Sequence, residues 1–234
     1  MSDTPSVSLV CCDLVSVAFD GTIVERAFTE AIATQGIVTG TEAYVRSMVR
    51  FDRTQGCPPA DVMRDLFAGD EPRVLASCLA FERSFRAAAD RFCITPPPDA
   101  AAALGKIAES GVRVCLMSGL SRSSSKVVAD RLGSLAGLGP VLCADDAPRG
   151  FPWPDLALTA SLRLGVGDVR ELAMVSATES GIQCGRRAGA GVIVGMLTGS
   201  RTARALRRAG ATHVLDSFAA LPDLVLQEAE LHKL

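Results

Sequence analysis

Polar residues follow several apolar stretches of this 234-residue chain, at the points where predicted strands end. Asp13 comes after an apolar run that begins at residue 7, and Ser118 comes after the run 112–117. Other residues at or just after such ends are Asp145, Asp146, Ala177 and Thr198. Ligands of open parallel sheets bind at the carboxyl ends of strands. A carboxylate there can act as a nucleophile when it is exposed and a cation orients it.

The elements that would position these residues alternate between apolar strands and amphipathic helices. Strands are expected at residues 112–118, 141–144, 171–177, 191–197 and 212–216. Helices are expected at residues 99–109, 123–132, 155–164, 180–188, 201–208 and 218–229. The segment 7–19 begins as a buried strand, as in a sheet covered on both faces. This alternation predicts an α/β fold with an open, mostly parallel, doubly wound sheet.

A helical segment interrupts the alternation after the first strand. Residues 24–35 have helical apolar spacing, and residues 41–92 read as helical apart from two Gly- and Pro-containing breaks. We therefore expect two parts. The first is a Rossmann-like core of residues 1–20 and 95–234, and the second is a helical cap of residues 21–94.

Composition narrows the classes of partner. Apolar residues make up 48% of the chain and the formal net charge is −2, with no basic patch that would predict nucleic-acid binding. The sequence contains no run of 18 apolar residues, so no membrane span is predicted. The N-terminus lacks a signal-peptide pattern, so a cytoplasmic protein is expected. The eight cysteines form no C-x-x-C pair and only two histidines occur, which argues against zinc. The oligomeric state is not predicted.

The order of these segments resembles the haloacid dehalogenase superfamily, and more closely its phosphonatase-like branch. The matching stretches are Asp13-Leu14 with VERAFTEAI, then LMSGLSR, DDAPRGFPWPDL, ESGIQCGRRAGAGVIVGMLTGS and THVLDSFAALPDL. The resemblance implies a hydrolase with a Rossmann-like core, a helical cap and a small, phosphorylated ligand. It implies that Asp13 is the nucleophile and a Mg²⁺ ligand, and that Ser118, with Gly119 beside it, binds the transferring phosphoryl group.

Two later motifs lack the residues that this chemistry needs. Phe151 stands where the pattern R-G-R-P-x-P-D has its second cation, and Arg149 is the nearest remaining basic residue. Ala177 and Gly181 stand where the pattern V-G-D-T-x-S-D has two magnesium-binding aspartates. Glu179 is the nearby acid and hence the candidate second Mg²⁺ ligand. Mg²⁺ binding is therefore weakly supported, and catalysis is expected to be weak or lost.

Two further comparisons with the family pattern concern the nucleophile and the cap. An alternative register reads residues 18–22 as a degenerate D-x-D-G-T motif with Ala18 at the nucleophile position. We prefer Asp13, because in the other register a carboxylate would lie within a buried strand, which is costly. The phosphonatase mechanism also uses a cap lysine, and residues 48–53, where it is expected, contain none. Carbon–phosphorus cleavage by that route is disfavoured.

Three hypotheses about function follow. The first is a divergent hydrolase that keeps Asp13 and recruits Glu179, Asp145, Asp146 or Arg149 in place of the missing groups. The second is a non-catalytic relative that binds a ligand or partner in the same cleft, with Phe151 and Trp153 in an apolar wall. The third is an unrelated α/β enzyme that uses different residues. A serine hydrolase is its obvious candidate, and it is disfavoured because no G-x-S-x-G nucleophile elbow occurs and both histidines lie near the C-terminus.

Overall fold

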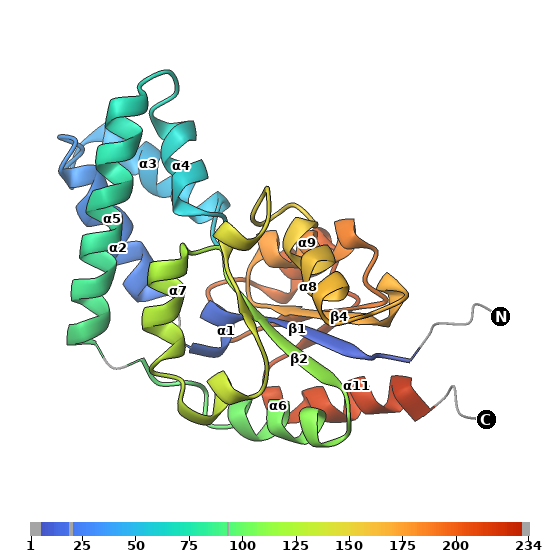
Figure 1. Ribbon diagram of the computed structural model, residues 1–234. Coiled ribbons are helices and arrows are strands. Elements are labelled where there is room, and N and C mark those ends of the chain that lie inside the picture. Colours follow the sequence, from blue (N-terminus) through green and yellow to red (C-terminus); the bar gives the residue numbers. More distant parts are fainter. Residues whose placement is uncertain (1–5, 19–20, 93, 231–234) are drawn as a thin grey trace.

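The computed structural model describes residues 6–18, 21–92 and 94–230, and within them the strands form one parallel sheet (Figure 1). The strand order is β3-β2-β1-β4-β5-β6. The strands are β1 (Leu9–Asp13), β2 (Arg113–Met117), β3 (Val141–Leu142), β4 (Leu172–Ser176), β5 (Val192–Met196) and β6 (His213–Leu215). The chain order reverses beside β1, so the crevice at its carboxyl end is the switch point where such sheets bind ligands. The predicted α/β doubly wound sheet is confirmed.

Helices cover both faces of this sheet, which explains the continuous apolar runs of its central strands. They are α6 (Ala100–Glu109), α7 (Arg122–Ala129), α8 (Asp155–Arg163), α9 (Glu179–Ala188), α10 (Ala203–Ala209) and α11 (Leu221–Glu230). Short 3-10 turns are η1 (Gly133–Gly137), η2 (Ala144–Asp146), η3 (Val169–Glu171) and η4 (Phe218–Ala220). Because side chains alternate along a strand, Val10 and Cys12 pack into one core while Leu9 and Cys11 pack into the other.

The first strand ends at Asp13, within the segment 7–19 that is expected to begin as a strand. A short helix, α1 (Leu14–Ala18), follows it directly. The Asp13 carboxylate explains this, because it accepts the backbone N–H of Val15 at 3.1 Å and the hydroxyl of Ser16 at 3.0 Å and so caps the helix. Ala18 therefore ends a helix and does not follow a strand, which removes the basis of the alternative register. Phe19 and Asp20 lie outside the described residues.

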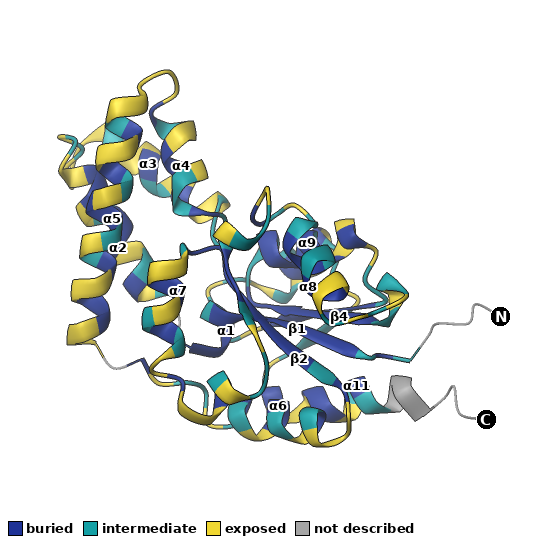
Figure 2. Ribbon diagram, in the orientation of Figure 1, coloured by how far each residue is buried: buried dark blue, intermediate teal, exposed yellow. Residues whose placement is uncertain are grey.

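Four helices lie between α1 and α6 in the chain and stand beyond the carboxyl end of the sheet (Figure 1). They are α2 (Thr22–Ala33), α3 (Glu42–Arg53), α4 (Pro59–Leu66) and α5 (Glu71–Arg91). Their inward faces are buried while their outer faces are exposed (Figure 2). Phe28 of α2 stacks on Phe51 of α3 with ring centroids 4.6 Å apart, so these helices share an apolar core. None of the described helices is long and apolar enough to cross a membrane.

Candidate functional site

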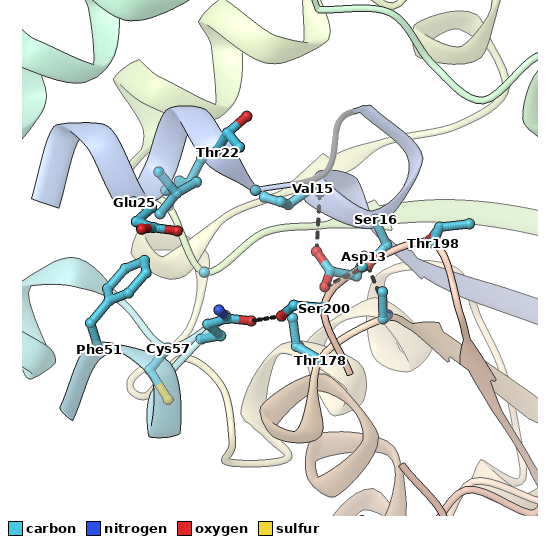
Figure 3. Close-up of a pocket in the computed structure, with 18 residues that line it drawn as sticks. Asp13, Val15, Ser16, Thr22, Glu25, Phe51, Cys57, Thr178, Thr198 and Ser200 are labelled. Carbon is cyan, nitrogen blue, oxygen red and sulfur yellow. Dashed lines mark hydrogen bonds between the residues drawn. The ribbon is translucent and has the colours of Figure 1, made fainter. Parts of the chain in front are cut away.

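A cavity of about 390 Å³ lies between the helical insert and the carboxyl ends of β1, β2 and β4 (Figure 3). Its walls come from α1, α2, α3, the loop after α3 and the loops after β2, β4 and β5. The lining residues are Asp13, Val15, Ser16, Gly21, Thr22, Val24, Glu25, Phe51, Gln55, Gly56, Cys57, Gly119, Leu120, Ala177, Thr178, Thr198, Gly199 and Ser200. Such a volume suits a small molecule.

Asp13 lies at the base of this cavity and is 1% exposed. Besides Val15 and Ser16, the hydroxyl of Ser176 donates to its carboxylate at 2.9 Å. Burial raises the pKa of Asp13 above its ordinary value, although the hydrogen bonds from Ser176, Ser16 and Val15 act in the opposite direction. The carboxylate is therefore held by protein donors on both oxygens, which reduces its freedom to attack a substrate or to bind a metal.

The raised pKa of Asp13 predicts how the stability of the folded protein depends on pH. Between 3.8, the ordinary value, and the raised pKa, the folded protein binds more protons at Asp13 than the unfolded chain does. The contribution of Asp13 to stability is thus present below pH 3.8 and is lost as pH rises through the raised pKa. We expect the free energy of unfolding of Asp13→Asn to increase relative to that of the wild type as pH rises through this window.

Urea denaturation of both proteins at a series of pH values measures this difference. The amide changes the hydrogen bonding with Ser16 and Ser176 and so adds a constant offset, but it does not titrate, and the slope reports the carboxyl group alone. Two parallel pH profiles would show that the pKa of Asp13 is the same in the folded and unfolded chains.

Ser16 and Ser176 are site residues that the sequence did not single out. The Ser16 hydroxyl also accepts the backbone N–H of Ala177 at 2.9 Å, and the Ser176 hydroxyl accepts that of Thr178 at 3.0 Å. The strand register places Cys12 beside Val175, so Ser176 follows directly beside Asp13. One signal was available, because Ser176 replaces the glycine of the V-G-D-T-x-S-D pattern.

Gly181 packs closely against this serine. A Cβ atom built on Gly181 would lie 2.6 Å from Ser176 Cβ and closer still to its hydroxyl oxygen. A side chain at residue 181 is therefore incompatible with Ser176 in its present place. The glycine that replaces aspartate at residue 181 therefore leaves the space that the Ser176 side chain occupies.

The residues around Asp13 do not fit a Mg²⁺ site, although hydrolases of the resembled family generally use this ion. Mg²⁺ requires near-octahedral oxygen coordination and is usually held by one or two carboxylates. The described residues contain no group of three or more His, Cys, Asp or Glu side chains able to hold a metal. Glu179 is 40% exposed in the first turn of α9, lies 3.8 Å from Arg201 and does not line the cavity.

Ser118 and Gly119 lie together after β2, but only Gly119 lines the cavity. Ser118 is fully buried, and its hydroxyl accepts the backbone N–H of Leu120 at 3.1 Å. The hydroxyl thus shapes the turn that brings Gly119 and Leu120 to the cavity wall. Its role toward a phosphoryl group stays a prediction.

The loop after α3 closes one side of the cavity through close backbone contact. Gly56 adopts a φ of +86°, which favours glycine, and a Cβ atom on Gly119 would lie within 3.0 Å of its backbone. Ser180 donates a hydrogen bond to the carbonyl of Gln55, and Ser200 donates to the Gln55 side chain at 3.2 Å. Two glycines and these polar contacts therefore hold the loop against the core.

We expect Gly119→Ala to displace this loop and to lower the free energy of unfolding by about 1–3 kcal/mol, because the new methyl group meets backbone and not a flexible side chain. Faster hydrogen exchange at residues 54–58, with urea unfolding, would measure both effects. Gly105→Ala in α6 is a matched control, since nothing lies within 4 Å of its Cβ position and alanine favours a helix by about 1 kcal/mol. Equal effects of the two substitutions would contradict the contact.

Arg149, Phe151 and Trp153 do not line the cavity. Phe151 is 1% exposed and packs into the core on the α8 and α9 side of the sheet. Arg149 forms a two-pronged ion pair with Asp155 at 2.9 and 2.7 Å, and its guanidinium lies 4.5 Å from the centroid of the Trp153 ring. The structure therefore gives no geometric support to these three as ligand-binding residues.

Asp145 and Asp146 hold local structure at the start of α7 and outside the cavity. Asp145 accepts the backbone N–H of Arg122 at 2.6 Å. Asp146 forms ion pairs with Arg122 at 3.2 Å and Arg163 at 3.1 Å. Burial raises the pKa of Asp146, but hydrogen bonds from Cys143 and from these arginines outweigh it and hold the pKa well below its ordinary value. Neither carboxylate replaces the missing groups beside Asp13.

Comparison with known proteins agrees with this architecture. The family model of the haloacid dehalogenase-like hydrolases matches residues 8–189. The chain belongs to this family. Among curated relatives, a phosphonoacetaldehyde hydrolase of Hahella chejuensis is 33% identical over 42% of this chain and 34% of its own length. That of Bordetella avium is 37% identical over 44% of this chain and 37% of its own length. The aligned region thus spans little more than a third of these relatives.

Solved structures show the same haloacid dehalogenase-like fold along nearly the whole chain. A phosphonoacetaldehyde hydrolase-like protein from Oleispira antarctica aligns with a TM-score of 0.80 and 19% identity, covering 97% of this chain and 93% of its own. A hydrolase from Pseudomonas syringae also aligns with a TM-score of 0.80, at 18% identity, covering 95% and 99%. At these identities the likeness supports the fold alone.

Proposed function

We propose that this haloacid dehalogenase-like protein retains a ligand-binding cavity in which phosphoryl transfer through Asp13 is weak or lost. The observation that carries the proposal is the packing of Ser176 against both Asp13 and Gly181. The Ser176 hydroxyl engages the nucleophile position, and its side chain fills the space that a carboxylate at residue 181 would need. A non-catalytic role in binding a ligand or partner through the same cavity is the second candidate.

The charge of the cavity supports the same proposal. Phosphoryl transfer relies on cations that offset the charge of the phosphate and the nucleophile. No Lys, Arg or His is among the described lining residues. Arg201, next to the lining residue Ser200, pairs with Asp52 at 2.9 Å and faces Glu179. Removing one positioned charge-stabilising group typically costs about 10²–10³ in rate, and losses within one catalytic unit are not additive.

The curated relatives suggest one substrate, phosphonoacetaldehyde, for a direct comparison. The chain's three lysines are Lys106, Lys126 and Lys233, and none lies between residues 21 and 94. A Schiff base with an aldehyde from a lysine of the helical insert is therefore not available, and we propose no cleavage of this compound. Magnesium-dependent phosphate release by wild type and Asp13→Asn, from a generic phosphomonoester and from phosphonoacetaldehyde, tests the proposed function.

A further inference from the structure

The ionisable groups that line the cavity are acidic. Asp13 and Glu25 are the carboxyl groups among the described lining residues, and no basic side chain accompanies them. Burial raises the pKa of the Cys57 thiol to about 11, so this third ionisable group is neutral at pH 7. A dianionic phosphate ester would meet the negative charge of Glu25 here without a counter-ion, which disfavours its binding.

Glu25 is free to bind a ligand. It lies in the first turn of α2, is exposed to solvent and forms no ion pair with any residue that the structure describes. The neighbouring Arg26 instead pairs with Glu30 at 3.2 Å. Figure 3 shows Glu25 and Phe51 at the same end of the cavity, across from the carboxylate of Asp13.

A second feature of the wall also points to a ligand. Phe51 provides an aromatic surface beside Glu25, and aromatic rings attract organic cations.

We propose that the cavity binds a small organic ammonium ion, with Glu25 as its counter-ion and Phe51 beside its alkyl part, in preference to a phosphate ester. This inference names the ligand class of the site described under the proposed function and rests on that proposal. The ammonium group pairs with the exposed Glu25 carboxylate, and no basic side chain among the described lining residues competes for it. A volume of about 390 Å³ limits the ligand to the size of a small metabolite.

Four probes with the same butyl chain and different head groups separate the effect of charge on binding from the effect of shape. Butylammonium, butanol, butyrate and butyl phosphate are titrated into the full chain at pH 7 and low salt, and binding is measured by calorimetry. We expect butylammonium to bind most tightly and butyl phosphate most weakly, with the preference for ammonium falling as salt screens the charges. Equal or tighter binding of butyl phosphate, or no binding of any probe, overturns the inference.

Variants of Glu25 assign the effect to this carboxylate. Glu25→Gln is expected to weaken butylammonium binding by about fivefold, as for a partly exposed ion pair, without changing butanol binding. Glu109→Gln removes the same charge from an exposed position on α6, outside the cavity lining, and is the matched control. Glu25→Lys should place butyl phosphate ahead of butylammonium. An unchanged order in both Glu25 variants contradicts the assignment.

The phosphate-release assay keeps this inference distinct from the proposed function. If the wild type prefers butylammonium but hydrolyses phosphomonoesters through Asp13, the proposed ligand class holds and the proposed loss of catalysis is refuted. If the wild type prefers butyl phosphate without hydrolysing it, the ligand class is refuted and the proposed function is not contradicted.

Discussion

The triple variant Ser176→Gly/Ala177→Asp/Gly181→Asp is expected to gain Mg²⁺ affinity by about tenfold or more over the wild type, since carboxylate count is a main determinant of binding by hard cations. Ser176→Gly frees the Asp13 carboxylate from one donor and opens the space beside Gly181. The two new aspartates then restore the carboxylates of the family pattern, one directly after β4 and one in the first turn of α9. Calorimetric titration with Mg²⁺, and Mn²⁺ spectroscopy as a second readout, measure the gain.

The single variant Gly181→Asp is the control that tests the packing argument. Its Cβ atom would lie 2.6 Å from Ser176 Cβ, so we expect a loss of stability and no gain in Mg²⁺ affinity. Urea unfolding of each variant establishes that it is folded before metal is added. If Gly181→Asp alone binds Mg²⁺ as tightly as the triple variant, Ser176 does not obstruct the metal site.

Wild type is expected to release phosphate from p-nitrophenyl phosphate in the presence of Mg²⁺ no more than about tenfold faster than Asp13→Asn. In a haloacid dehalogenase-like site with its cation and carboxylates in place, loss of the nucleophile should lower the rate by at least about 10³-fold, because the catalytic groups act as one unit. Here the Asp13 carboxylate is 1% exposed and held by Val15, Ser16 and Ser176. The substitution therefore removes a group that contributes little to the rate.

Asp13→Asn prepared in parallel also controls for contaminating phosphatases, which would contribute equally to both samples. A haloacid dehalogenase-like phosphatase with intact motifs serves as the positive control for the assay. Magnesium-dependent turnover by wild type that exceeds the variant by 10² or more would falsify the proposed loss of catalysis and show that other residues have replaced the missing groups.

The fold was predictable because its signals are local. Apolar runs separated by helical patterns from residue 99 onward predict strands and helices close to those observed. The position of Asp13 at the end of β1 followed from the cost of burying a carboxylate within a strand. The short helix α1 after this strand was not predicted, because its capping by Asp13 depends on a side-chain contact that apolar periodicity does not report.

The missing motif residues were likewise evident from the sequence. Phe151, Ala177 and Gly181 are the wrong residue types for their positions in the family pattern, whatever the structure around them. The positions of the candidate replacements could not be predicted in the same way. Arg149 is bound to Asp155, and Glu179 faces Arg201 outside the cavity lining. Long charged side chains pair with whichever partner the tertiary fold brings near, and spacing along the chain does not determine that partner.

The sequence by itself determined the doubly wound sheet, the family and the loss of motif residues, since these depend on residue type and order. Only the tertiary structure decided which residues surround Asp13. Ser176 and Gly181 fit together across a turn, and Gly56 meets Gly119 from a distant part of the chain. Glu25, to which the matching stretches assign no role, reaches the cavity because α2 lies beside the end of the sheet. Close packing between segments far apart in sequence sets the shape and charge of the site.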